Sequence, residues 1–427
     1  MKKINRLYSV LFLLAFLLFF SENAWQLEIF GEQALQDQLY VKITAVTIML
    51  LFLFSLMHIK KKTNQFEFKN VWVLFFCSII ISHFFGAVRL YNQPLSYVLT
   101  SIIWFSGVLI YFYLNKFFSS KFYAKKIFNL IIMFGLIACF LAIGTAFIDL
   151  DVFVTNRVQE TERFGFTRVF GFGENAVILT FIYYFILLMH SRNAKSFKNI
   201  SFFLISGITL FFVFLSRQIM FSLFAIFIIY SIKNKIIKNT TAIYFLLLLV
   251  VTVVILMVAT PFFSELIQSL NYNNTKDFES GTFAVRIFGI AYYFEQFAKT
   301  LGTGFGWISI APTAAGTMNP IYYATQSLNF YLVDQGIFQT LFQFGILGVI
   351  VIVLYVKKII SNSKTRSKEY EIEKLTLYYF IISRMFALNY LFTWPLFTVF
   401  YGIIAYISER FAQEKDSINL SKRVNIN

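Results

Sequence analysis

The sequence predicts an all-α fold: a polytopic bundle of transmembrane helices with about twelve spans. Composition is the first observation behind this prediction, because 58% of the 427 residues are apolar and only 14% are charged. The mean hydropathy is +0.70. These values exclude an ordinary soluble globular protein. The second observation is that apolar runs of about membrane-spanning length recur along the chain, and the third is an alternating distribution of lysine and arginine between them.

The first apolar run, residues 7–20, follows the basic start "MKKINR" and is similar to a signal peptide. Glu22 lies at the third position before Ala24, where a small residue is needed for cleavage. We therefore predict that this run is an uncleaved first span.

Eleven further runs are long enough to span a bilayer when flanking side chains extend toward the interface. The last two are also compatible with one re-entrant hairpin. The predicted spans are residues 40–57, 71–88, 95–114, 127–148, 176–189, 200–215, 219–232, 241–260, 337–356, 375–392 and 396–407.

The basic residues predict the orientation of these spans. With the N-terminus in the cytoplasm, the alternate connections and the C-terminal tail hold most of the 37 lysine and arginine residues. This is the distribution that the positive-inside rule describes, so both termini are predicted to be cytoplasmic. The net charge of +16 is then an orientation signal, and we predict no binding of nucleic acid.

The two connections 149–175 and 261–336, both predicted on the outer side, are too long to be simple turns. We treat residues 1–427 as a single integral membrane domain that carries both outer loops. Within the larger loop, apolar residues recur at helical spacing and predict a helix that lies along the membrane surface. They are Phe283, Ile287, Ile290, Phe294 and Phe297.

The stretch "TLGTGFGW", residues 300–307, has three glycines and is similar to a phosphate-binding loop. It lacks both the strand–loop–helix context of a dinucleotide site and the Lys-Ser/Thr ending of a Walker loop. We interpret it as a bend that turns the outer loop back to the membrane, with an outer phosphate site as the alternative.

No metal or cofactor is predicted. The histidines lie inside or at the cytoplasmic ends of the predicted spans, where structural roles are expected. The carboxylates of Asp149 and Asp151 are the remaining candidates for a divalent cation, and we take them to be solvated.

Three arginines outside the cytoplasmic connections stand out. Arg217 begins a span at the outer boundary, where the alternative is an interfacial anchor. Arg286 lies in the predicted surface helix, where the alternative is a solvated salt bridge. Arg384 lies about 13 Å from the outer end of its span. A charge at that depth costs about 2.5–3.5 kcal/mol, so Arg384 is expected to face a polar cavity or a partner.

These residues occur in an order that resembles a known superfamily. A Ser-Arg at the start of a span is followed by a long outer loop with an arginine-bearing helix, then "LGTGFG", then "YLVDQGIFQTLFQFGILG". This arrangement, over residues 215–348, resembles the Wzy-type polysaccharide polymerase and O-antigen ligase superfamily. The resemblance covers about a third of the chain, and the layout of spans agrees with it.

The resemblance implies a glycosyltransferase in the bacterial inner membrane, active at its outer face and without a metal or a cofactor. The substrates would be undecaprenyl-pyrophosphate-linked oligosaccharides, as donor and as acceptor, and a chain-length regulator would be a possible partner. Arg217 and Arg286 would correspond to the arginines that contact the donor pyrophosphate. A two-arginine clamp suits pyrophosphate because guanidinium groups bind phosphate oxygens in pairs.

The sequence departs from the ligases of that superfamily at one position. Ligases carry His-Asn where Val333, Asp334 and Gln335 stand here. The missing histidine favours a polymerase over a ligase. Asp334 is then the candidate base, because partial burial raises a carboxyl pKa. Its alternative role is to cap the tenth span.

Five further residues are predicted to bind substrate. Arg157, Arg163 and Arg168 of loop 149–175 would retain an acidic glycan or a second pyrophosphate, with a solvated loop as the alternative. Glu295 and Arg384 complete the set. The alternatives to a polymerase are a ligase or another lipid-dependent glycosyltransferase, and a flippase for lipid-linked oligosaccharides. A flippase is expected to have two related halves, and the single long loop breaks such symmetry.

Overall fold

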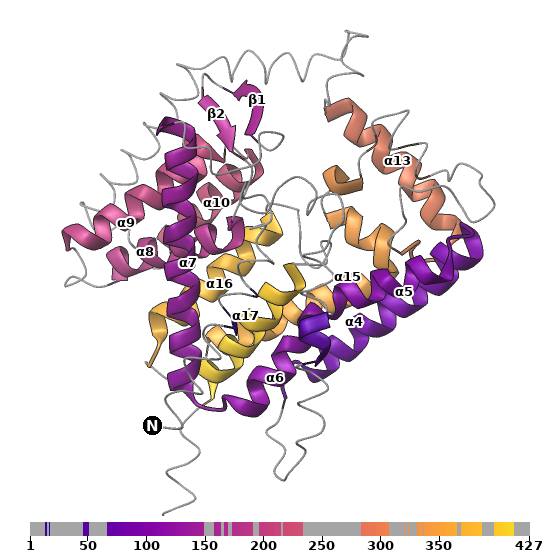
Figure 1. Cartoon of the computed structure of the whole chain (residues 1–427), viewed down its shortest axis with the longest axis horizontal. Helices are drawn as coiled ribbons and strands as arrows, with labels where there is room; N and C mark the ends of the chain where they lie inside the picture. Colours follow the sequence, from indigo (N-terminus) through magenta and orange to yellow (C-terminus); the bar gives the residue numbers. More distant parts are fainter. Residues whose placement is uncertain are drawn as a thin grey trace, which may run out of the picture.

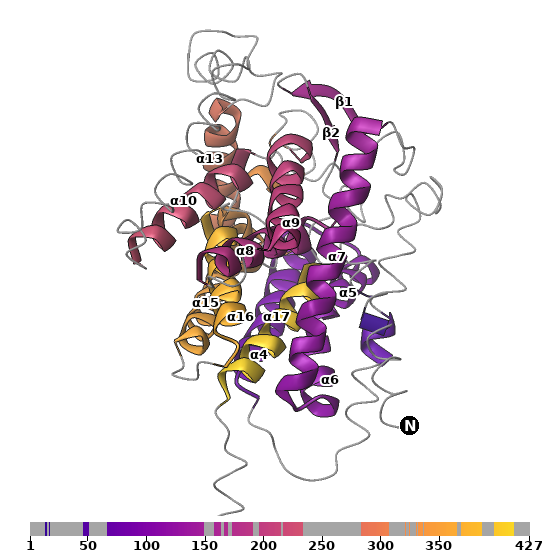
Figure 2. The same ribbon diagram turned by 90° about the vertical axis from the view of Figure 1, so that its left-hand side faces the viewer.

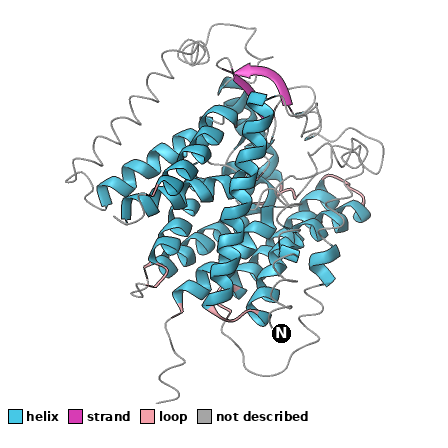
Figure 3. Ribbon diagram, turned by 60° about the vertical axis from the view of Figure 1, so that its left-hand side comes forward, coloured by secondary structure: helices cyan, strands magenta, loops and turns pink. Residues whose placement is uncertain are grey.

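In the residues that it describes, the computed structural model is helical, apart from turns and one short hairpin of two strands (Figure 3). The hairpin lies inside the loop 149–175, which was expected only as a loop. The structure describes residues 13–14, 17, 46–50, 66–148, 158–163, 166–169, 173–190, 196–214, 217–233, 283–306, 321, 324, 330, 332–335, 337–364, 369–386 and 397–413.

The helices of the first half of the chain match the predicted runs from residue 71 onward. Three of the runs contain local changes of helix type: η3 and η7 are π-helical, and η4 is a 3₁₀ turn. The bounds are α4 (Lys69–Ile81), η3 (Ser82–Leu90), α5 (Leu95–Trp104), η4 (Phe105–Leu109), α6 (Ile110–Phe117), α7 (Lys121–Ile148), α8 (Glu174–His190), α9 (Phe197–Ile208), η7 (Thr209–Val213) and α10 (Arg217–Lys233).

The second half contributes α13 from the large outer loop and the last group of helices. The helix predicted from the phenylalanine spacing is confirmed over the whole of α13. The bounds are α13 (Phe283–Lys299), the 3₁₀ turn η10 (Leu332–Gln335), α15 (Ile337–Ser363), α16 (Glu371–Phe386) and α17 (Phe397–Ala412).

Within the described residues, three helical segments are long and apolar enough to cross a membrane: Lys69–Leu90, Lys121–Phe147 and Phe338–Ser363. Three shorter apolar helices accompany them: Glu174–His190, Phe197–Val213 and Ile219–Lys233. The chain is therefore a helical protein with candidate membrane spans. The count of about twelve stays a prediction, because runs such as 241–260 and both chain termini lie outside the described residues.

Described parts of two connections predicted to be cytoplasmic, 115–126 and 357–374, contact each other near the lower end of α7 in Figure 1. Lys121 at the start of α7 pairs with Glu369 before α16, at 3.2 Å between Nζ and Oε2, and Lys125 pairs with Glu373. His190 at the end of α8 lies 3.7 Å from Glu371. The starts of α7 and α16 therefore lie near the end of α8, so that α8 runs opposite to both, as alternating membrane spans do.

A second polar group at the same end holds α17 against α6 and the start of α4. Tyr111 donates a hydrogen bond to Glu409, which also accepts one from the backbone N–H of Glu67. The Arg410 guanidinium donates to the backbone and side-chain oxygens of Asn115. Because Glu409 and Arg410 are almost fully buried, these bonds replace the water that both charges lose on folding.

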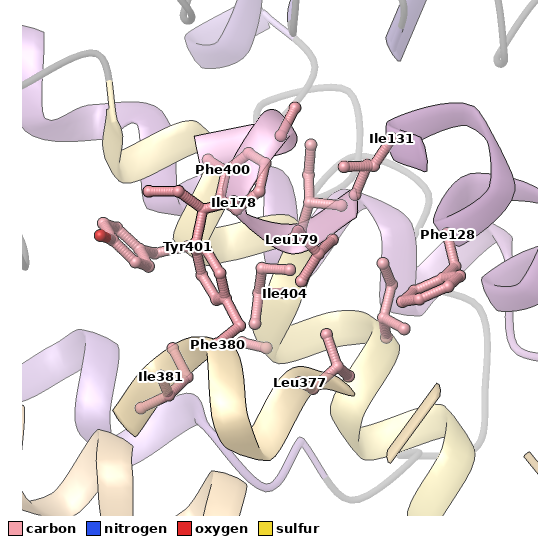
Figure 4. Close-up of a cluster of buried hydrophobic side chains, with 14 of the residues drawn as sticks. Phe128, Ile131, Ile178, Leu179, Leu377, Phe380, Ile381, Phe400, Tyr401 and Ile404 are labelled. Atoms are coloured by element: carbon pink, nitrogen blue, oxygen red, sulfur yellow. The ribbon is translucent and has the colours of Figure 1, made fainter. Parts of the chain in front are cut away.

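The core between α7, α8, α16 and α17 consists of branched aliphatic and aromatic side chains (Figure 4). Phe128 and Ile131 extend from α7, and Ile178 and Leu179 from α8, toward Phe380 and its neighbours on α16 and α17. This packing fixes the relative positions of α8 and α16, which together carry the buried charges described below.

The hairpin lies at the opposite end of the bundle, beside the upper end of α7 (Figures 1 and 2). β1 (Val158–Arg163) pairs antiparallel with β2 (Phe166–Val169), with a bulge between Gln159 and Glu162. Only two residues of sequence separate the strands, a length typical of tight hairpins. β2 also contacts η7, so the hairpin covers the ends of two helix segments.

Candidate functional site

The glycine-rich stretch forms a tight loop directly after α13. Gly302, Gly304 and Gly306 all have positive φ angles, between 71° and 82°. This left-handed region is easily accessible only to glycine, which explains the alternating glycines. The loop packs against α15 at Gly345, where φ is 70° and ψ is −167°, so that the helix is interrupted there. We call residues 300–306 together with Gly345 the glycine lock.

Backbone hydrogen bonds hold the glycine lock together. The N–H groups of Phe305 and Gly306 donate to the carbonyls of Phe342 and Gln343, each at 2.8 Å. The N–H of Ile346 donates to the carbonyl of Gly302 at 3.0 Å. These bonds use the groups that the break in α15 would otherwise leave unsatisfied.

The glycine lock is therefore a structural joint. A phosphate-binding loop presents several free backbone N–H groups to the anion. Here the Gly304 N–H donates to Thr300 Oγ1 at 3.1 Å, and the next two N–H groups are bonded to α15. This geometry favours the interpretation of "TLGTGFGW" as a bend over the alternative of a phosphate site. His83 of η3 packs against Gly306 and bonds to the Ile79 carbonyl at 2.7 Å, a structural role as expected.

A second, smaller hydrophobic core joins α13 to the glycine lock and to the first turns of α15. Tyr293 of α13 packs on Phe305 and Phe342, with ring centroids 6.1 and 5.7 Å apart. The Tyr91 hydroxyl donates to Gln296 of α13 at 3.4 Å, and burial raises the pKa of Tyr91. The second half of α13 is thus fixed by its buried side chains.

Arg286 and Asp334 lie on two elements that contact each other. Arg286 is in the first turn of α13, and Asp334 is in η10, which packs on both α13 and α15. Gln335 of the same turn lies against Gly289, where a Cβ would come within 2.7 Å of its Nε2. The structure therefore brings the two elements together, while the side chains of Arg286 and Asp334 lie outside its described part.

Glu295 is on the opposite side of α13 from the second core. Its side chain is 69% exposed and pairs with Lys299 at 3.3 Å, one helical turn away. An exposed pair of this kind contributes little to stability. The substrate-binding role of Glu295 stays a prediction.

Arg217 is the first residue of α10, which follows η7 after a short connection. Because β2 contacts η7, the hairpin that carries Arg163 and Arg168 lies at the same end of the bundle. Arg168 is opposite Gln159 in the register of the strands. The side chains of these three arginines, and all of Arg157, lie outside the described part. The clamp of Arg217 and Arg286 therefore stays a prediction.

Arg384 has the partner that its depth requires. Its guanidinium Nη1 lies 3.0 Å from the Glu174 carboxylate, and Nη2 donates to Asn175 Oδ1 at 2.6 Å. The exposed fraction of the Arg384 side chain is 1%, and that of Glu174 is 19%. This contact links α16 to the first turn of α8. Direct binding of substrate by Arg384 stays a prediction.

Glu174 and Asn175 were missed by the sequence analysis. The signal was present, because "GENAVILTF" places an acidic residue and an amide directly before a long apolar run. A buried arginine in one span implies an acidic or amide partner in another. The partner could not be chosen, because the sequence does not state which spans are neighbours.

In the part of the chain that the structure describes, no group of three or more His, Cys, Asp or Glu side chains could hold a metal ion. Asp149 and Asp151 lie outside that part. Cys77 and Cys139 are both free thiols.

No protein-family model, no curated protein and no solved structure matches this chain.

Proposed function

We propose that this protein is a polymerase of undecaprenyl-pyrophosphate-linked oligosaccharide repeat units, active at the outer face of the bacterial inner membrane. The growing chain is transferred from its lipid pyrophosphate to a sugar hydroxyl of the next lipid-linked unit. The proposal includes a topology of about twelve spans with both termini in the cytoplasm.

One observation carries the proposal. The elements with the candidate arginines lie at the end of the bundle away from the basic connections. The hairpin with Arg163 and Arg168 contacts η7, and α10 begins with Arg217 directly after η7. The basic connections meet at the other end through pairs such as Lys121–Glu369. This separation is what an outer-face site for an anionic lipid headgroup requires.

The chemistry assigned to the site needs a cation for the leaving group and a base for the nucleophile. The bond between the anomeric carbon of the donor and its phosphate oxygen breaks, and the acceptor oxygen bonds to that carbon. Arg217 and Arg286 stabilise the negative charge on the departing pyrophosphate. Asp334 takes the proton of the acceptor hydroxyl. Lipid pyrophosphate and the chain extended by one transfer are the products.

The packing of α13 supports this assignment of roles. Catalytic groups act well only when the elements that carry them are held rigidly. The glycine lock and the second core fix α13 against α15, and η10 with Asp334 packs between them. The helix of Arg286 and the turn of Asp334 therefore belong to one rigid unit.

The buried pair of Arg384 and Glu174 has a positioning role in this proposal. It joins α16 to the first turn of α8, a few residues after the hairpin. Because α10 also packs on α16, the pair helps to hold the outer ends of three helices in one arrangement.

The proposal is tested by the size distribution of glycans in a bacterial strain that lacks this protein. Loss of polymerase activity is expected to reduce a ladder of chains to a single repeat unit, and the ladder should return when the gene is supplied on a plasmid. Full-length chains that stay on their lipid would instead indicate a ligase. Single units that accumulate on the cytoplasmic side would indicate a flippase.

A further inference from the structure

Two glutamines of α15 are buried side by side just before the break at Gly345. The exposed fractions of Gln339 and Gln343 are 2% and 3%. They are four residues apart in a helix, so their side chains share one face. An otherwise strongly apolar segment thus contains two neighbouring amides away from solvent.

Neither amide oxygen accepts a hydrogen bond from the described part of the chain. Gln296 of α13 is a useful comparison, because it is also buried, at 5%. Its Oε1 accepts bonds from the Tyr91 hydroxyl at 3.4 Å and from Lys299 at 3.3 Å. Buried polar atoms in proteins are nearly always paired, and an unpaired one is costly. The oxygens of Gln339 and Gln343 are therefore open to a hydrogen-bond donor that the described part of the chain does not supply.

The neighbours of the two glutamines locate them between α13 and η4. Phe342, one residue before Gln343, packs on Phe294 of α13 at 5.1 Å. Phe344, one residue after it, packs on Phe105 of η4 at 5.1 Å. Successive residues of a helix point about 100° apart. The face of Gln339 and Gln343 therefore lies between the side that contacts α13 and the side that contacts η4.

The two glutamines are also close to the candidate base in the chain. Gln339 follows Asp334 by five residues and lies in the first turn of α15. The pair begins where the outer loop enters the helix and ends at the glycine lock.

The chemistry of an amide oxygen restricts the ligand. It is a neutral acceptor, so it needs a hydrogen-bond donor and offers nothing to a pyrophosphate anion. Sugar hydroxyls and acetamido N–H groups are such donors. We propose that Gln339 and Gln343 form a sugar-binding subsite that holds the glycan of the lipid-linked substrate, separate from the arginines that bind pyrophosphate. This inference rests on the proposed function.

The test compares two ligands on the purified full-length protein in lipid nanodiscs: undecaprenyl pyrophosphate, and the same lipid with one oligosaccharide repeat unit. The variants are Gln339→Met and Gln343→Met, which keep the length of the side chain and remove the acceptor. We expect unchanged or higher melting temperatures for both, and a loss of about tenfold in affinity for the glycan-bearing lipid, the size of one good hydrogen bond. Affinity for the lipid without glycan should stay the same.

Gln296→Met is the matched control, because the amide of Gln296 has partners within the fold. It is expected to lower the melting temperature and to leave the ratio of the two affinities unchanged. Should the methionine variants fail to accumulate, Gln339→Asn and Gln343→Asn shorten the side chain but keep the amide, and they should lower the same ratio.

The outcomes of this test distinguish a failure of the proposed subsite from a failure of the proposed function. If the unaltered protein prefers the glycan-bearing lipid and the variants keep that preference, the subsite is overturned and the proposed function stands. If the unaltered protein binds neither lipid, both are overturned.

Discussion

Arg384 and Glu174 lie 210 residues apart in the chain, yet they form a buried ion pair with 3.0 Å between Nη1 and Oε1. Two helices that carry opposite charges into an apolar bundle depend on each other, because either charge alone would be buried without compensation. This pair therefore gives a direct test of the packing of α8 against α16.

Glu174→Gln leaves the Arg384 guanidinium buried without its carboxylate. We expect the free energy of unfolding to fall by about 3 kcal/mol, the size typical of a broken buried pair. Arg384→Met combined with Glu174→Gln removes both charges and should recover most of the loss. Arg89→Met, at an exposed arginine of η3, is the control. Thermal denaturation in detergent measures all four proteins, and equal stability of Glu174→Gln and the control would contradict the pairing.

The glycine lock predicts a difference between two helical glycines. A Cβ on Gly86 would fall inside van der Waals contact of the Phe305 backbone, whereas one on Gly207 would meet only the ring edge of Phe181 at 3.3 Å. Gly86→Ala should destabilise the protein by about 1–3 kcal/mol or more through overpacking. Gly207→Ala should change it little, because a side chain can move aside. The melting temperatures of the two variants provide the comparison, and similar values would show that the loop does not pack on η3.

The predicted orientation is tested by cysteine accessibility. Leu301, within the glycine lock, is 92% exposed, and Glu369 is on the surface at the opposite end. In a background with Cys77→Ala and Cys139→Ala, Leu301→Cys should react with a membrane-impermeant maleimide in intact cells stripped of their outer layers. Glu369→Cys should react only after the membrane is opened. The reverse pattern would contradict the orientation.

Much of the fold could be predicted from the sequence because it follows from periodicity. The spacing of Phe283, Ile287 and Phe294 predicts α13, and the structure confirms it. The break at Gly345 could not be predicted, because a glycine inside an apolar run is usually an ordinary helical residue. The break depends on hydrogen bonds from Phe305 and its neighbours, about forty residues away in the chain.

The features of the candidate site were also only partly predictable from the sequence. The depth of Arg384 predicts that it needs a partner, but its choice of Glu174 depends on which helices are neighbours. The hairpin with Arg163 and Arg168 is a local structure that the charged composition of its strands did not indicate. The need of a deep charge for a partner was therefore predictable, while contacts between distant segments required the fold.

The proposed roles of the arginines predict specific losses of activity. Arg217→Ala and Arg286→Ala should each lower the rate of chain growth by about 100-fold or more, the size expected when a group that stabilises the leaving charge is removed. The amount of each variant in the membrane should be normal. Arg89→Ala removes another arginine near the outer end and should retain activity. Normal polymer length with Arg217→Ala or Arg286→Ala would contradict the proposal that these arginines bind the donor pyrophosphate.

The central claim is that this chain by itself joins lipid-linked repeat units. The measurement is the size distribution of products from the purified protein in lipid nanodiscs, supplied with one undecaprenyl-pyrophosphate-linked repeat unit and with EDTA to remove divalent metal ions. The account predicts a ladder of lipid-linked chains and release of undecaprenyl pyrophosphate in proportion to the bonds formed. A substrate that stays a single unit, with and without added magnesium, would contradict it.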